Sequence, residues 1–348
     1  MQLFQLIETP NKIYNDAGNK ARADIYCLAE KLSFQPVKII YNTSAANYFD
    51  RLKRKLRYLY DWKKCYSEIT ANSIVLLQHP INVTNNYILR KLKTKKNIKY
   101  ISIIIDIEEL RQFYFNKYYK KEFENTLNIA DIIVVHNEKM LKFFLKKGFA
   151  RDKIINIESF DYLQENNNTA EFEKSINFAG NLDIAKCGFI GQLKQLSKIR
   201  INLYGPNFNK DLLTTKNIKY HGVFPVNEIH KKINKGFGLV WDGNNIDTCS
   251  GYFGQYLKFN NPHKLSLYLS CGLPVIIWKQ AAQAEFVKKY NVGLCVENLK
   301  EAENIIYNMN EVEYANLINS VNKIKSLLSS GYFTTKALKQ ALNLLIKQ

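Results

Sequence analysis

Short apolar runs rich in β-branched residues alternate with longer segments of helical periodicity along most of the chain. This alternation is typical of βαβ units, which assemble into parallel sheets. Helical patterns include residues 20–32, 138–147, 311–329 and 334–347. The predicted strands are residues 3–7, 37–41, 74–78, 100–106, 131–136 and 154–158 in the first half, and 175–179, 199–204, 218–221, 238–241, 274–278 and 293–296 in the second.

A polar, asparagine-rich segment, residues 161–174, interrupts the alternation and is predicted to be a linker. It separates residues 1–160 from residues 175–330, which are followed by a helical tail at 331–348. The predicted fold class is therefore α/β, with two Rossmann-like, doubly wound domains. Ligands of such sheets bind beyond the carboxyl ends of the strands, so we expect the site in the cleft between the facing domains.

The composition agrees with a folded chain of two domains. The chain has 348 residues, of which 46% are hydrophobic, and this excludes a disordered protein. No apolar run approaches the ~18 residues of a membrane span, and the N-terminus lacks a signal-peptide pattern, so we expect a cytoplasmic protein. Six cysteines without a CxxC pair indicate buried thiols rather than disulfides or a zinc site.

The formal net charge of +19 allows two interpretations. It favours anionic partners, such as phosphates, nucleic acid or anionic lipid. It is also what AT-rich coding would produce, since lysine, asparagine, isoleucine and tyrosine are all abundant.

The start of one predicted helix carries the chemistry of a phosphate site. Asn260 and Asn261 are suitable N-cap residues and Pro262 suits the first helical position, so His263 and Lys264 fall in the first turn. A cation there opposes the helix dipole unless an anion is bound, whereas exposed backbone N–H groups attract phosphate. An ordinary helix with an indifferent lysine is the alternative. The preceding residues 251–256, which include Tyr252, are predicted to form a flexible loop that could fold over a ligand, with a plain loop as the alternative.

Three predicted strands of the second half end on residues suited to a nucleotide pocket. Gly180 allows close backbone approach, Asn181 offers a donor and an acceptor, and Gly205 follows Tyr204, a candidate stacking face. Asp242 ends another strand, where it could bind a sugar hydroxyl or cap a turn. Three such endings in one domain favour nucleotide binding.

In the first half, a glycine-containing loop joins the first strand region to a helix. Gly18, Asn19 and Lys20 could cradle a phosphate or a reacting sugar, and Asp24 lies one turn further on. The GxGxxG pattern of a dinucleotide site is absent. Asp24 has a simpler interpretation, in which it balances Lys20 and Arg22.

A carboxylate follows the very apolar strand at residues 100–106. Asp106 is a candidate general base facing the cleft, and Glu108 suits the first turn of a helix. The rival interpretation takes Asp106 and Glu108 as a divalent-metal pair that holds a nucleotide diphosphate. His79 and His136 also end strands, where hydrogen-bonded structural roles are favoured.

The stretch from Arg51 to Lys64 holds seven basic residues and one acid. Leu52, Leu56 and Leu59 share a helical face, with Trp62 nearby, which suits an anionic membrane surface. The alternatives are packing on its own domain or on a second copy of the chain, so a homo-oligomer is a further candidate assembly.

Taken together, the motifs resemble a bacterial group of GT-B glycosyltransferases. The group includes β-1,6-galactofuranosyltransferases of surface polysaccharide synthesis and glucosyltransferases that extend N-acetylglucosamine on serine-rich adhesins. The resemblance runs in order over nearly the whole chain. It is carried by NDAGNKARADI at 15–25, DIEELR at 106–111, HNEKM at 136–140, FAGNL at 178–182 and YFGQYLKFNNPHK at 252–264.

This resemblance implies a UDP-sugar donor in the C-terminal domain, an acceptor on the N-terminal side, and neither metal nor cofactor. It also implies that the helix at 331–348 packs back toward the first domain. Without a metal, helix N-termini and basic side chains must neutralise the leaving diphosphate, and Lys264 is placed to do so. Many retaining GT-B enzymes carry a glutamate where this chain has Leu267. An inverting mechanism with Asp106 as base is therefore expected.

The expected function is transfer of a hexose, with galactofuranose favoured, from a UDP-sugar to a glycan or glycoprotein acceptor, lipid-linked glycans included. Glucosyl transfer onto a serine-rich adhesin is the first alternative. A non-enzymatic, basic nucleic-acid-binding protein is the alternative from another class, but the sequence shows no RNA-binding signature. We therefore expect no nucleic-acid partner.

Overall fold

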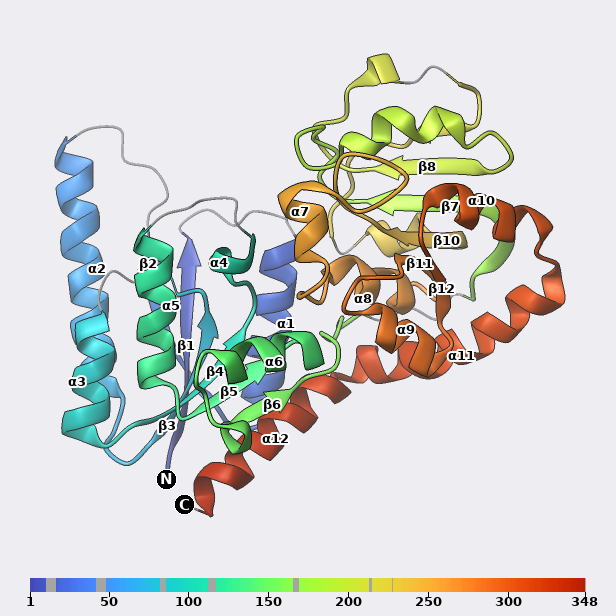
Figure 1. Ribbon diagram of the computed structural model, residues 1–348. Helices are drawn as coiled ribbons and strands as arrows, with labels where there is room; N and C mark the ends of the chain where they lie inside the picture. Colours follow the sequence, from blue (N-terminus) through green and yellow to red (C-terminus); the bar gives the residue numbers. More distant parts are fainter. Residues whose placement is uncertain are drawn as a thin grey trace.

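The computed structural model describes residues 1–10, 17–41, 48–81, 86–111, 117–164, 169–212, 215–226 and 228–347. These residues form two six-stranded, all-parallel sheets, each in its own domain. Figure 1 shows the two domains side by side, with helices α1, α7 and α8 near their junction.

The first sheet has the strand order β2-β1-β3-β4-β5-β6. β3 is buried along its whole length, which explains its continuous apolar run, since helices cover both faces of a parallel sheet. All six predicted strands of this half are confirmed, with shifts of a few residues at their ends. The elements are β1 (Leu3–Pro10), α1 (Ala17–Lys31), β2 (Gln35–Tyr41), α2 (Tyr48–Glu68), β3 (Ile74–His79), α3 (Asn86–Lys96), β4 (Lys99–Ile104), α4 (Glu108–Arg111), α5 (Lys117–Ile129), β5 (Ile132–Val135), α6 (Glu138–Lys146), η1 (Arg151–Lys153) and β6 (Ile154–Asn156).

The second sheet has the order β12-β11-β10-β7-β8-β9, and its six predicted strands are likewise confirmed. Each sheet reverses its winding direction beside its first strand, as doubly wound folds do. The elements are β7 (Glu171–Ala179), η2 (Gly188–Gln195), β8 (Arg200–Tyr204), η3 (Lys210–Leu212), β9 (Ile218–Tyr220), η4 (Ile229–Lys231), β10 (Lys235–Val240), α7 (Gly251–Tyr256), α8 (His263–Ser270), β11 (Val275–Trp278), α9 (Ala284–Tyr290), β12 (Gly293–Val296), α10 (Leu299–Asn308), α11 (Glu311–Ser330) and α12 (Tyr332–Ile346).

The predicted flexible loop at residues 251–256 is wrong, because these residues form helix α7. Two glycines in six residues disfavour a helix by about 1 kcal/mol each relative to alanine. Tertiary contacts outweigh that cost: Tyr256 is buried, and a Cβ at Gly254 would lie 2.5 Å from the Cys249 carbonyl carbon. The position therefore needs glycine for packing rather than for mobility.

Two boundaries also differ from the sequence interpretation. β7 begins at Glu171, inside the predicted linker, because Glu171 pairs with Lys235 at the start of β10. Helix α8 begins at His263 with Pro262 as its N-cap, one residue later than expected, and no side chain caps it. His263 and Lys264 still occupy the first turn, so the free backbone N–H groups lie beside them.

The C-terminal helix α12 packs against α1, β5 and β6 of the first domain. Gly331 makes the turn from α11 with a φ of 76°, and a Cβ there would lie 2.1 Å from Leu28 Cδ2 of α1. At its far end, Lys99 Nζ donates to the Leu345 carbonyl at 2.9 Å. Figure 1 shows α11 running beneath the second domain and α12 beneath the first, so that the two chain ends lie close together.

Candidate active site

Side chains that follow strands of both sheets line a cavity of about 200 Å³ between the domains. Asp106 follows β4 of the first sheet, and Asp242 follows β10 of the second. Helix α8 adds His263 and Lys264. The described lining residues are Ala21, Ile105, Asp106, Arg111, Phe160, Lys186, Asp242, Phe253, Tyr256, Asn260, Asn261, Pro262, His263 and Lys264.

Lys264 forms an ion pair with Asp242 in the wall of this cavity. Its Nζ lies 2.8 Å from Asp242 Oδ1 and 4.4 Å from the centroid of the Phe178 ring. Burial opposes the charged ammonium, but the Asp242 carboxylate outweighs it, and the pKa of Lys264 is raised. The sequence interpretation required a bound anion to explain a cation in the first turn of α8. The structure supplies an anion of the chain itself, so the position of Lys264 alone does not demand a phosphate.

Two further cations line the cavity, and the sequence analysis missed both. Lys186 follows β7 after a short turn, and its Nζ lies 5.6 Å from the centroid of the Phe253 ring. Arg111 ends α4, where its guanidinium contacts Glu108 at 2.7 Å. Arg111 stood in the motif that carried the family resemblance, but nothing in the sequence placed it beside Lys264. The cavity therefore has more positive charge than Lys264 alone provides.

Asp106 is held by residues of both domains. The Tyr256 hydroxyl of α7 donates to Asp106 Oδ1 at 3.2 Å, and Ile107 N donates to the Tyr256 hydroxyl at 3.0 Å. Arg111 lies 3.8 Å from Asp106 Oδ2. Burial raises the pKa of Asp106, while Arg111 and the Tyr256 hydroxyl work in the opposite direction. A carboxylate with a raised pKa, open to a cavity, is suited to accept a proton.

The rival interpretation, in which Asp106 and Glu108 bind a divalent metal, is not supported by the contacts of Glu108. Glu108 lies in the first turn of α4 and binds Arg111, as a helix-start acid would. No group of three or more metal-ligating side chains occurs among the described residues. The Glu108 carboxylate is therefore engaged by a cation of the chain.

Asn261 joins the two domains through a buried network. Its backbone N–H donates to His136 Nδ1 at 2.9 Å, and His136 Nε2 donates to the Ile104 carbonyl at 3.0 Å. The Asn261 side-chain amide donates to the His136 and Glu158 carbonyls and accepts from Asn137 and Gln283. Burial lowers the pKa of His136 to about 4, so the imidazole stays neutral. His136 is thus structural, as expected. Asn261 lines the cavity, but its side-chain amide already forms hydrogen bonds within the protein.

Two neighbouring polar groups are buried without a hydrogen-bond partner among the described residues. They are Asn260 Oδ1 and the two ring nitrogens of His263. The His263 ring lies against Tyr162, with 5.3 Å between ring centroids. Burial and the nearby Lys20 charge lower the pKa of His263 to about 3, so the ring is neutral. Unpaired polar atoms beside a cavity are the groups that a ligand would satisfy.

Among the glycine-containing strand ends of the second domain, Gly180 lies beside Lys264, since a Cβ on Gly180 would lie 3.2 Å from Lys264 Cε. Gly180 and Gly205 approach so closely that a Cβ on Gly205 would lie 1.8 Å from the Gly180 carbonyl oxygen. Asn181 Oδ1 accepts from Asn207 at 2.9 Å. Tyr204 is buried and stacks on His221 with 4.6 Å between ring centroids, so its ring is already covered. None of these four predicted donor residues is among the described lining residues.

The exposed Tyr252 lines a neighbouring groove of about 430 Å³, together with Arg111 and Lys258. On the acceptor side, Gly18 and Asn19 lie in the first turn of α1, and Asn15 and Asp16 fall outside the described residues. Lys20 pairs with Asp24 and donates to the Leu163 carbonyl at 2.8 Å. Asp24 therefore balances Lys20, the simpler of the two interpretations, and Ala21 is the α1 residue that reaches the cavity.

The remaining candidates have structural roles. His79 Nδ1 lies 2.9 Å from Thr126 Oγ1, and burial lowers the pKa of His79 to about 3. All six cysteines are free thiols, and four of them are buried: Cys65, Cys187, Cys249 and Cys271.

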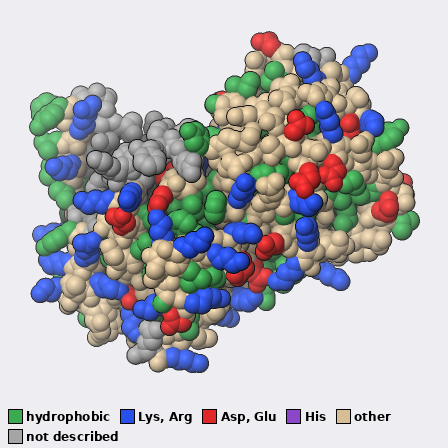
Figure 2. Space-filling model, in the orientation of Figure 1, with side chains coloured by type: hydrophobic (Ala, Val, Ile, Leu, Met, Phe, Trp, Pro, Cys, Tyr) green, Lys and Arg blue, Asp and Glu red, His purple; other side chains and the backbone are tan. Residues whose placement is uncertain are grey.

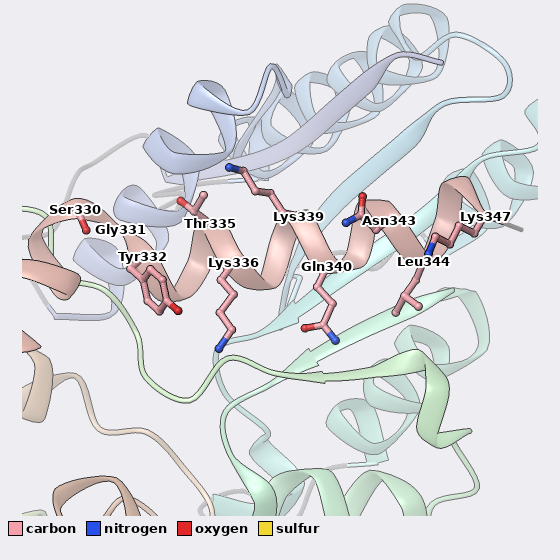
Figure 3. Close-up of a pocket in the computed structure, with 10 residues that line it drawn as sticks. All are labelled: Ser330, Gly331, Tyr332, Thr335, Lys336, Lys339, Gln340, Asn343, Leu344 and Lys347. Carbon is pink, nitrogen blue, oxygen red and sulfur yellow. The ribbon is translucent and has the colours of Figure 1, made fainter. Parts of the chain in front are cut away.

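A larger groove of about 550 Å³ runs along α12 and shares no described residue with the interdomain cavity. Figure 3 shows Lys336 and Lys339 leaving opposite sides of the helix. Lys336 is bound to Glu158 at 3.0 Å. The lysine side chains of this groove point away from one another. Its described lining residues include no carboxylate, whereas Asp106 and Asp242 line the interdomain cavity. The larger volume of the groove therefore does not make it the better candidate for the active site.

Two models of one family match nearly the whole chain. The glucosyltransferase 3-like N-terminal domain matches residues 5–159, and the glucosyltransferase 3-like C-terminal domain matches residues 176–341. The chain is 37% identical over 225 residues to the β-1,6-galactofuranosyltransferase WbbI of Escherichia coli K12. That alignment covers 62% of this chain and 65% of the relative, slightly less than two thirds of its length.

A second relative is similar over a longer span. Glucosyltransferase 3 of Streptococcus gordonii is 25% identical over 326 residues, which is 92% of each chain. Among solved structures, Anabaena HepE in complex with UDP-glucose superposes over the full length of both chains, with a TM-score of 0.60 and 12% identity. At that identity the superposition shows the fold, and it confirms the expected GT-B arrangement.

Proposed function

This chain belongs to the glucosyltransferase 3-like family, and on that premise we propose that it transfers a hexose from a UDP-sugar to a glycan acceptor. The observation that carries the proposal is the convergence, in one interdomain cavity, of three cations with a carboxylate of raised pKa. Family membership also disfavours the nucleic-acid-binding alternative.

The second domain is the proposed donor side. Lys264, Lys186 and the free N–H groups at the start of α8 face the cavity, where a diphosphate would meet them. Such groups stabilise the negative charge that develops on a leaving diphosphate. The choice of UDP is supported by HepE, a protein of the same fold that was solved with UDP-glucose. The unpaired atoms of Asn260 and His263 would then bind polar groups of the donor.

Asp106 is the proposed base. It accepts the proton of the acceptor hydroxyl while the hydroxyl oxygen attacks the anomeric carbon. The bond from that carbon to the diphosphate breaks, and UDP leaves with the electron pair. Attack opposite the leaving group inverts the configuration. This direction agrees with Leu267, which packs against the apolar core where many retaining enzymes carry a glutamate.

Galactofuranose is the favoured sugar, because the 37% identical relative is a β-1,6-galactofuranosyltransferase. Glucose is the alternative, supported by Streptococcus gordonii glucosyltransferase 3, which aligns over more of the chain. The acceptor is proposed to be a glycan of a surface polysaccharide or glycoconjugate, and the site of action is the cytoplasm. The identity of the transferred sugar would show which of the two relatives this chain resembles in activity.

The test is a transfer assay with UDP-galactofuranose, UDP-glucose and UDP-galactose, with product detected by mass spectrometry and its anomeric configuration by NMR. We expect an inverted product, and loss of transfer but retained UDP binding in Asp106→Asn. Asp152→Asn, an exposed carboxylate in η1, is the matched control. A chain that neither binds UDP nor hydrolyses any UDP-sugar would contradict the proposal.

A further inference from the structure

Helix α2 presents a stripe of apolar side chains to the outside of the molecule. Positions 49, 52, 56 and 59 repeat at alternating spacings of three and four, so they share one helical face. Phe49 is 71% exposed and Leu56 is 58% exposed. The exposed apolar residues of this stripe are Tyr48, Phe49, Leu52, Leu56, Leu59 and Tyr60.

The opposite face of α2 is already anchored in the first domain. Trp62 and Cys65 are fully buried, and Asp61 accepts from Ile40 N of the edge strand β2 at 3.1 Å. The apolar stripe therefore cannot turn inward without removing these residues from the core. It is a second apolar face of a helix whose core-facing side is satisfied.

Basic side chains flank the stripe on both sides. Exposed cations of α2 lie next to it in the sequence at almost every turn, and Figure 2 shows hydrophobic and basic side chains alternating down the edge of the molecule where α2 stands in Figure 1. Of its three acids, Asp50 lies in the first turn, Asp61 is buried and Glu68 lies 3.5 Å from Lys64. The flanking cations are Arg51, Lys53, Lys55, Arg57, Lys63 and Lys64.

The charges beside the stripe indicate which kind of partner the stripe contacts. A symmetric contact between two copies of α2 would bring the same cationic flanks together, and like charges repel. An anionic lipid surface attracts the flanks while its acyl boundary accepts the apolar stripe. No helix among the described residues is long and apolar enough to cross a membrane.

We propose that α2 lies in the plane of an anionic membrane surface and docks the first domain there through its apolar stripe and basic flanks.

The start of α2 lies at the same edge of the first sheet as the proposed base, Asp106. The start of α2 follows the carboxyl end of β2, and Asp106 follows the carboxyl end of β4 in the same parallel sheet. A docked α2 would thus hold the carboxyl edge of this sheet, at β2, next to the membrane surface. This arrangement suits a glycan acceptor carried on a lipid, a point that rests on the proposed function, whereas the docking itself does not.

The test is flotation of the full-length chain with vesicles of equimolar phosphatidylcholine and phosphatidylglycerol, against vesicles of phosphatidylcholine alone. We expect binding to the anionic vesicles that high salt reverses. Each cation removed from the flank should weaken partition about fivefold. Replacing Arg51, Lys53, Lys55 and Lys63 by Gln should therefore weaken it by roughly 600-fold. Phe49→Ser with Leu56→Ser should also weaken it.

The matched control removes four exposed lysines from the same domain but from other helices, with Lys120, Lys121, Lys142 and Lys146 changed to Gln. It should bind vesicles as the unmodified chain does, and equal loss in the control would overturn the proposal. A stripe variant that floats unchanged but shows a smaller mass in light scattering would also overturn it, in favour of a second copy. Vesicle binding without any sugar transfer would leave the docking intact and contradict only the proposed function.

Discussion

Lys264 and Asp242 form an ion pair in the wall of the interdomain cavity, 2.8 Å apart, with only 13% and 12% of their side chains exposed. The pair joins the first turn of α8 to the end of β10. Removing one partner leaves the other charge buried and uncompensated, which is costly. Lys264 is therefore held in place before any ligand arrives.

Lys264→Ala is expected to weaken UDP binding roughly 10- to 150-fold, because a charge-assisted hydrogen bond contributes about 1.5–3 kcal/mol. Calorimetric titration with UDP measures the change. Lys264→Ala combined with Asp242→Asn removes both charges and guards against misfolding, and Lys300→Ala in α10 is the exposed-lysine control. An unchanged dissociation constant in the folded variants would place the phosphate site elsewhere.

The pH profile of turnover reports on Asp106. Arg111 works against burial and lowers the pKa of this carboxyl, so in Arg111→Gln that pKa rises further. A base must be ionised, and activity falls as pH drops through its pKa. The acidic limb of kcat should therefore move to higher pH in Arg111→Gln and stay in place in Lys147→Gln. A limb that does not move in Arg111→Gln would assign the base to another residue.

Turnover is expected to be independent of divalent metal. Lys264 and Lys186 provide the positive charge for the leaving diphosphate. The Glu108 carboxylate forms an ion pair with Arg111 at 2.7 Å and is therefore already engaged by a cation of the chain. Excess EDTA should leave kcat unchanged in assays at saturating donor. Loss of activity that Mn²⁺ or Mg²⁺ restores would support the rival pairing of Asp106 with Glu108.

Asn261→Ala is expected to destabilise the protein by several kcal/mol, because each buried partner left unsatisfied costs about 1–3 kcal/mol. The change removes side-chain hydrogen bonds to His136, Asn137 and Glu158 together. Urea unfolding measures the loss, and Asn343→Ala on the exposed side of α12 is the control. Equal stability of the two variants would show that the network does not hold the domains together.

Asp161 links the segment between the domains to α12 and should make stability depend on pH. Its carboxylate accepts from Phe333 N at 3.2 Å and Thr334 N at 2.7 Å, and burial raises its pKa to about 6. Between about pH 4 and 6 the folded state binds this proton more tightly than the unfolded state, so the contribution of Asp161 to stability falls as pH rises. The change is on the order of 3 kcal/mol.

Asp161→Asn removes this titration and should flatten the dependence of unfolding free energy on pH across that window. Urea unfolding at several pH values is the measurement, with Asp152→Asn as the exposed control. Curves of the same slope for Asp161→Asn and the unmodified chain would show that Asp161 titrates at its ordinary pKa.

The two parallel sheets and the position of Asp106 at a strand end can be predicted from the amino-acid sequence alone. Strands buried on both faces read as continuous apolar runs, such as IVLL at residues 74–77 and VIIW at residues 275–278. The first-turn position of Lys264 followed from local capping chemistry. These features depend on neighbours in the sequence, so a local pattern is sufficient to predict them.

Which side chains come into contact depends on the packing of the two domains. Tyr256 contacts Asp106 across 150 residues, and Asn261 contacts His136 across 125. The sequence predicts Tyr204 as a free stacking face, but in the structure His221 covers its ring. It predicts a loop at residues 251–256, but these residues form a helix that buries Tyr256. Contacts between distant segments depend on how two domains pack, and no local periodicity records that packing.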